Sequence, residues 1–145
     1  MTAGGEGDVA AELADYQRAA ALRAAVRLIL RRGEQVARSA GLTPQRQLLL
    51  LMIKGAPDGS EQATITELAE RLQLAQNTVT ELVARAEAAG LLEREPSGTD
   101  GRVVHLRLTQ EGDRRLAATV SALRADRRHL FDVLSEQRDT GMPQP

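Results

Sequence analysis

The hydrophobic periodicity of the sequence changes at Gly90, and this change limits the folds that are open to the chain. Before it, four apolar residues recur at steps of three and four and predict one buried face of a helix over about 75–89: Val79, Leu82, Val83 and Ala86. After it, residues 91–95 and 102–108 have the pattern of two strands. The segment 96–101 between them contains Gly and Pro and predicts a hairpin turn. The rest of the fold must therefore pack around a helix that leads directly into a hairpin.

Two helices are predicted before this segment. Apolar residues at helical spacing indicate the first over about 11–40, and Gly41 has the residue type that ends a helix. Thr43 followed by Pro44 fits the N-cap and first-turn positions of the second, which reaches about Lys54. The second helix is apolar nearly all round, so we expect it in the middle of the core.

Two more helices complete the predicted fold. Residues 64–66 could form a short strand, with Thr66 as the N-cap of a short helix that ends near Gln73. Thr109 is the expected cap of a last helix with a heptad-like seam, which is typical of packing against another helix or a partner subunit: Leu116, Val120, Leu123, Leu130 and Leu134. We predict a mainly α (α+β) fold, a winged helix-turn-helix with a wing of two or three strands and long N- and C-terminal helices.

The composition argues against several classes of function. None of the 145 residues is a cysteine, which excludes disulfides and thiolate metal sites. His105 and His129 are far apart, so we expect no metal site and no cofactor. No local motif pairs a nucleophile with a base or cradles a phosphate, so we do not expect an enzyme. The chain has no apolar run long enough for a membrane span and no secretory signal, so we expect a cytoplasmic protein.

Charge is unevenly distributed along the chain, although the net charge is only −1. Residues 1–55 hold eight basic and five acidic side chains, a net charge of +3. Residues 61–112 hold five basic and nine acidic ones, a net charge of −4. Only Tyr16 and Phe131 are aromatic, so stacking on single-stranded nucleic acid has little support. We place Tyr16 in a subunit interface, with an effector pocket as the alternative.

The order of the elements and three local motifs resemble the MarR family of winged-helix transcription regulators over about residues 42–112. The segment before the 75–89 helix resembles the family as ITELAERLQL, and the helix-to-strand segment as VTELVARAEAAGLLERE. The wing pattern of an Asp, one residue, an Arg and a strand that ends in Leu-Thr before a Gly is present as DGRVVHLRLTQEG. No insertion is needed between Gly90 and Gly112 to align these motifs.

The resemblance implies a homodimer that reaches successive major grooves of double-stranded DNA with its two winged helices. It implies a helical dimerisation region over 11–55 and 109–137 and a DNA-binding region over 56–108, between a disordered 1–10 and a frayed 138–145. It also implies a small-molecule effector whose binding shifts the spacing of the two winged helices and relieves repression. The expected function is a ligand-responsive repressor on a pseudo-palindromic operator. The alternative is a protein-interaction or small-molecule-sensing module that has lost DNA binding.

The candidate DNA-binding residues lie on the predicted helix and on the wing. Polar residues on the helix face opposite the apolar one would face the major groove, where Gln and Asn read adenine edges: Gln76, Asn77, Thr78 and Thr80. An ordinary polar surface is the competing interpretation. Arg94 would contact phosphate or form a solvated strand end. Arg102 would contact phosphate or the minor groove, or pair with Asp100, which we assign a structural role in the wing.

The chain departs from the family pattern at four of these places. Ala75 stands where the recognition helix usually has a Ser or Thr cap. Glu81, Glu95 and Gly101 stand where the family often has basic residues. Three places that usually attract phosphate are therefore neutral or negative, and we predict weak or unusual DNA binding.

Overall fold

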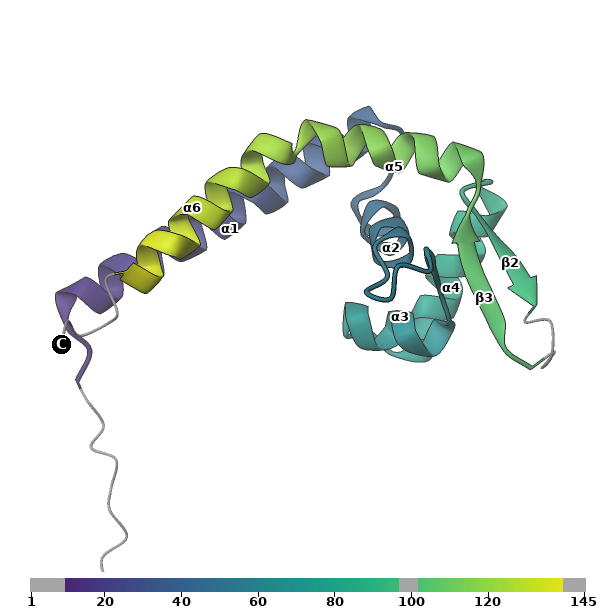
Figure 1. The fold of residues 1–145 in the computed structure, drawn as a ribbon, viewed down its shortest axis with the longest axis horizontal. Helices are drawn as coiled ribbons and strands as arrows, with labels where there is room; N and C mark the ends of the chain where they lie inside the picture. The colour runs from purple at the N-terminus through teal and green to yellow at the C-terminus, as the bar shows by residue number, and fades with distance from the viewer. Residues whose placement is uncertain (1–9, 97–101, 140–145) are drawn as a thin grey trace, which may run out of the picture. The chain divides into compact units, whose positions relative to one another are not determined.

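The computed structural model describes residues 10–96 and 102–139. Its fold is mainly helical with one small antiparallel sheet, which confirms the predicted class (Figure 1). Most of three predicted segments lies outside the described residues: the hairpin turn over 96–101, the N-terminus over 1–10 that was expected to be disordered, and the tail over 138–145 that was expected to be frayed. The elements are α1 (Leu13–Ser39), α2 (Pro44–Lys54), β1 (Gln62–Ala63), α3 (Ile65–Leu72), α4 (Gln76–Ala88), β2 (Leu92–Pro96), β3 (Val104–Leu108), α5 (Gln110–Ala122) and α6 (Arg124–Asp139).

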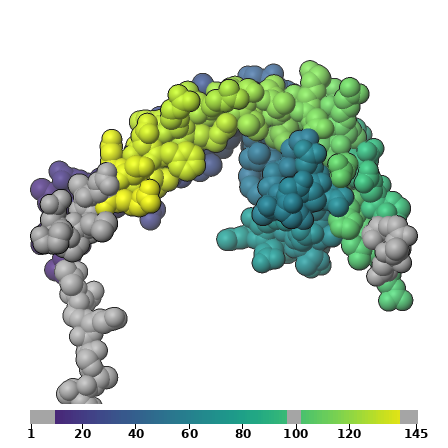
Figure 2. Space-filling view, viewed as in Figure 1, coloured from purple at the N-terminus to yellow at the C-terminus, as the bar shows by residue number. Residues whose placement is uncertain are grey.

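The chain divides into two compact units. The first contains α1 as far as Arg31 together with the chain from Ala125, and the second contains residues 32–124. In the first unit α1 and α6 contact each other, and the side chains of α6 lie over those of α1 in Figure 2. None of the described helices is long and apolar enough to cross a membrane.

The hydrophobic core lies in the second unit. Fully buried side chains from five elements and one loop meet there: Leu49, Leu50, Ile53, Leu68, Val79, Val83, Leu91, Leu92 and Leu106. Helix α2 supplies three of them and packs against α3, α4, α5 and β3, as its apolar composition predicted. The side chain of Leu48 on α2 is nevertheless 43% exposed.

The first turns of α2 and α3 are held by threonine caps. Thr43 accepts a hydrogen bond from the backbone N–H of Arg46, as its position before Pro44 predicted. The expected strand at 64–66 with a cap at Thr66 is wrong, because β1 ends at Ala63 and Thr64 caps α3. Thr64 and Glu67 form a reciprocal capping box. Thr66 could not form one, because the residue three positions after it is not an acid.

The sheet has the strand order β1-β3-β2, with both neighbours antiparallel to β3. On β3 the side chains of Leu106 and Leu108 are buried, while those of His105 and Arg107 are half-buried on the other face. Leu106 lies opposite Ala63 on β1 and Arg94 on β2. The alternation seen in the sequence therefore places Leu106 and Leu108 on the face of the wing that packs against the core.

The last helix is divided, whereas the sequence predicted one continuous helix from Thr109. Thr109 caps α5 as expected by accepting from the backbone N–H of Gly112, but the chain leaves helical geometry at Leu123. Leu116 packs into the core of the second unit, and Leu123 is buried as well. The heptad-like seam is therefore interrupted, and only its second half, on α6, belongs to the first unit.

Candidate nucleic-acid interface

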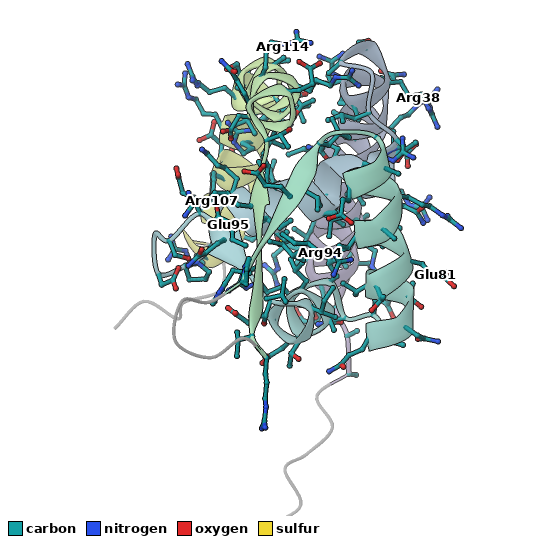
Figure 3. The ribbon with its side chains drawn as sticks, turned by 90° about the vertical axis from the view of Figure 1, so that its right-hand side faces the viewer. Arg38, Glu81, Arg94, Glu95, Arg107 and Arg114 are labelled. Carbon is teal, nitrogen blue, oxygen red and sulfur yellow. The ribbon has the colours of Figure 1, made fainter. Side chains whose placement is uncertain are left out.

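Helix α4 has one buried face and one exposed face. Val79, Val83 and Ala86 are fully buried against the core. The polar residues predicted to read bases are all exposed, and so is Glu81: Gln76, Asn77, Thr78 and Thr80. Figure 3 shows Glu81 pointing outward from α4, away from the hairpin. The structure therefore brings the four candidate readers together at the N-terminal end of one helix.

Several of these polar groups also bond within the chain. The side-chain nitrogen of Gln76 donates to the Thr66 hydroxyl at 3.4 Å. The side-chain carbonyl oxygen of Gln76 has no partner among the described residues. The side-chain oxygen of Asn77 accepts from the backbone N–H of Thr78 at 2.9 Å, which leaves its NH₂ group available. The hydroxyl of Thr80 donates to the backbone carbonyl oxygen of Gln76 at 2.8 Å and keeps only acceptor capacity.

The start of α4 has no side-chain cap. Ala75 occupies the N-cap position and makes no capping hydrogen bond. The first N–H groups of a helix carry partial positive charge and have no partner within the helix. Those of Gln76 and Asn77 are therefore suited to an anion such as a DNA phosphate, whereas that of Thr78 already donates to the side chain of Asn77.

Arg94 is exposed on β2 and pairs with an acid of α4. Its Nε donates to both carboxylate oxygens of Glu87, each at 3.2 Å, and joins β2 to the last turn of α4. Figure 3 shows Arg94 directed toward α4. This pair was missed from the sequence, although Gly90, with a φ of 74°, turns the chain back between its members.

Arg107 on β3 also pairs with acids. Its Nε lies 3.6 Å from the carboxylate of Glu95, and its Nη1 lies 4.0 Å from Glu61 (Figure 3). Glu61 also contacts Lys54 at 3.1 Å, and Asp113 contacts the same Nζ at 3.0 Å. Asp113, and then Glu61, raise the pKa of Lys54 above its ordinary value. Glu95, where the family often has a basic residue, thus forms an ion pair with Arg107 of the wing.

The other two wing residues are less completely described. Arg102 is exposed just before β3, whereas Asp100 lies outside the described residues, so their expected pairing stays a prediction. Within residues 10–96 and 102–139, no cluster of three or more His, Asp or Glu side chains could hold a metal ion. The exposed polar face of α4 and the hairpin beside it are therefore the candidate interface.

Comparisons with known proteins agree with this geometry. A sequence model of the MarR family matches residues 40–103. The uncharacterised HTH-type transcriptional regulator YsmB of Bacillus subtilis is 27% identical over 116 residues, which are 80% of this chain and 77% of YsmB. The HTH-type transcriptional repressor MdtR of the same organism is 30% identical over 97 residues, 67% of this chain, and the match spans only 60% of MdtR.

Solved structures share the fold. Wild-type MarR from E. coli superposes with a TM-score of 0.66 at 17% identity, covering 92% of this chain and 99% of that chain. YusO from Bacillus subtilis superposes with a TM-score of 0.59 at 25% identity, covering 88% and 86%. The resemblance seen in the sequence motifs is confirmed: the chain belongs to the MarR family of helix-turn-helix transcriptional regulators, a family without enzymatic activity.

Proposed function

We propose that the chain binds double-stranded DNA with α4 in the major groove and represses transcription from a pseudo-palindromic operator. One observation carries this proposal: α4 buries Val79, Val83 and Ala86 in the core and exposes on its other face the four candidate readers, Gln76, Asn77, Thr78 and Thr80. The helix is thus anchored as a recognition helix requires, and its free face holds side chains that can bond base edges.

Relatives support the choice of DNA as the partner. A mutant E. coli MarR was solved in complex with operator DNA, and a MepR mutant from S. aureus was solved bound to an oligodeoxyribonucleotide. Both share the fold of this chain at 17% and 18% identity, with TM-scores of 0.64 and 0.60. MdtR is a transcriptional repressor, which supports repression rather than activation for this chain.

The roles of the single residues follow from their hydrogen-bonding capacity. The side-chain carbonyl of Gln76 and the NH₂ group of Asn77 have no partner among the described residues, and they suit the donor and the acceptor on an adenine edge. Thr78 and Thr80 would add shorter contacts. Arg94 and Arg102 would bind the DNA backbone or minor groove, and Asp100 would hold the wing.

A second copy of the chain would complete the regulator. In the first unit several large apolar side chains are exposed, with Tyr16 65% and Phe131 66% exposed. The others among the described residues of this unit are Leu13, Val26, Leu28 and Leu30 on α1 and Leu134 on α6. Apolar patches of this kind mark interaction sites, and a homodimer would explain a two-fold operator.

The remaining parts of the proposal rest on the family. A small-molecule effector would bind the dimer and lower its affinity for the operator, by favouring a state that binds DNA less well. The protein would act in the cytoplasm, where its operator lies. Addition of the effector to a preformed complex would release labelled DNA.

Fluorescence anisotropy of a labelled duplex from the region upstream of the gene, over a salt series, tests DNA binding. A scrambled duplex of the same composition is the control. We expect tighter binding to the native duplex, with an affinity that falls as salt rises. Equal binding to both duplexes would argue against an operator in that region.

One observation favours a second candidate function. The net charge of −4 over residues 61–112 opposes phosphate contacts and suits a protein-interaction or small-molecule-sensing module. A folded dimer that binds neither duplex at low salt would support this module and overturn the DNA-binding proposal.

A further inference from the structure

The pair of Glu87 and Arg94 has a geometry that leaves one edge of the arginine free. Both carboxylate oxygens of Glu87 accept from Nε. The two terminal nitrogens, Nη1 and Nη2, have no hydrogen-bond partner among the residues that the structure describes. A guanidinium presents two such nitrogens in a fixed fork that matches phosphate oxygens. The Glu87 carboxylate therefore binds Nε and leaves the edge formed by Nη1 and Nη2 available for a phosphate.

The pair contributes little to the stability of the fold. The side chains of Arg94 and Glu87 are 40% and 41% exposed. Exposed ion pairs of this kind stabilise a protein only slightly, because water and salt screen them. The ion pair does, however, restrict the conformations of the long Arg94 side chain before DNA binds. Less conformational entropy is then lost when Arg94 binds a phosphate.

The geometry points to Glu87 as a positioning residue that orients Arg94 toward one phosphate of the DNA backbone. This inference rests on the proposed DNA binding and adds a residue that does not touch DNA itself. Glu87 need not release Arg94 when the phosphate binds, because the two anions use different nitrogens of the guanidinium.

A negative charge near DNA also repels phosphate, so the effect of removing Glu87 needs a control of equal charge. Glu93 supplies it, because it is exposed on the same strand as Arg94 and has no ion-pair partner among the described residues. Glu93→Ala removes the same charge without disturbing Arg94. We expect unchanged or slightly tighter binding from Glu93→Ala and about threefold weaker binding from Glu87→Ala.

A double-mutant cycle on the full-length protein tests the inference, with anisotropy of the native duplex over a salt series. Arg94→Ala should weaken binding about fivefold and make the salt slope shallower by about 0.9 per protomer, the value for one lost phosphate contact. Glu87→Ala should have no further weakening effect once Arg94 is absent. Glu87→Gln keeps an oxygen that accepts from Nε and should recover part of the affinity. Thermal unfolding of each variant shows whether its fold is intact.

Each other result has a definite meaning. If Arg94→Ala binds as the unmodified protein does, Arg94 contacts no phosphate, and the inference fails while the DNA-binding proposal stands. If Glu87→Ala matches Glu93→Ala, or weakens binding equally without Arg94, Glu87 has no positioning role. If the unmodified protein binds no duplex at low salt, the proposed function and this inference fail together.

Discussion

Glu81 is the residue on the recognition face whose charge most opposes DNA. It lies on the exposed side of α4, one residue from Thr80, where the resemblance to the family would place a basic side chain. Glu81→Arg should tighten binding to random duplex, because it replaces phosphate repulsion by attraction. Titration of both proteins against a random duplex at fixed salt measures the change. Identical curves would show that position 81 lies away from the DNA.

Arg102 is the cation predicted to serve the wing. Arg102→Ala should weaken operator binding tenfold or more, equivalent to about 1.4 kcal/mol, since a charge-assisted contact to the DNA would be lost. Anisotropy with the native duplex measures the loss, and circular dichroism tests the fold. Unchanged affinity in a folded variant would remove Arg102 from the site.

Gly112 is required by close packing at the start of α5. A Cβ at this position would overlap the backbone carbonyl of Leu91, which also accepts from the N–H of Thr109 at 3.0 Å. Because backbone cannot move aside as a side chain does, Gly112→Ala should destabilise the fold by about 1–3 kcal/mol. Chemical denaturation measures this, with Gly33→Ala as the control, because a Cβ there would make only an ordinary contact, at 3.9 Å from Cδ1 of Leu123. Equal stability of the Gly112 variant and the unmodified protein would contradict the packing argument.

At the scale of elements, the first turn of α5 is held by charge. Glu111 accepts from Arg114 at 2.6 Å and from Arg115 at 2.7 Å, and Arg115 also donates to the Gly41 carbonyl. Arg114, and then Arg115, lower the pKa of Glu111 from 4.5 to about 2. A lowered folded-state pKa stabilises the fold above the unfolded value, and this contribution disappears as pH falls from about 4.5 toward 2.

Glu111→Gln should therefore remove part of the loss of stability between pH 5 and pH 2, a window set by that shift. Urea denaturation of both proteins at several pH values measures it. The variant should be less stable than the unmodified protein at pH 6 and closer to it at pH 2. A constant difference across this range would show that Glu111 is unpaired in solution.

Elements also show where local patterns succeeded. Thr43, Thr109 and Gly41 were predicted correctly, because a cap depends on residues within one turn of each other. The faces of α4 and β3 were predicted for the same reason, since each has one period and one buried side. The start of α3 was placed two residues late, because the capping box at Thr64 was read as strand.

At the scale of the whole molecule, the apolar residues fall into two groups. Most of those in residues 32–124 are buried in one core, whereas α1 and α6 keep several large apolar side chains exposed in the first unit. Phe131→Ala should weaken the proposed dimer, because an aromatic side chain buried between two copies contributes much of the affinity of an interface. Sedimentation over a concentration series measures the dissociation constant.

Leu74→Ala is a useful comparison for Phe131→Ala, because Leu74 is an exposed apolar residue of the second unit that lies outside the expected dimerisation region. We expect this variant to leave the dimer unchanged if α1 and α6 form the interface. Equal dimer affinity for the Phe131 variant and the unmodified protein would place the interface elsewhere.

The sequence by itself determined the order of the elements, the caps of α2 and α5, the buried faces and the family, because periods and caps depend on near neighbours. Tertiary structure decided which charges meet. Glu87 pairs with Arg94, and Glu95 with Arg107, only because a helix end and two strands approach one another. The division of the last helix at Leu123 could not be predicted from the sequence either, because the heptad-like seam continues across Leu123. The two halves of the helix belong to different units of the structure.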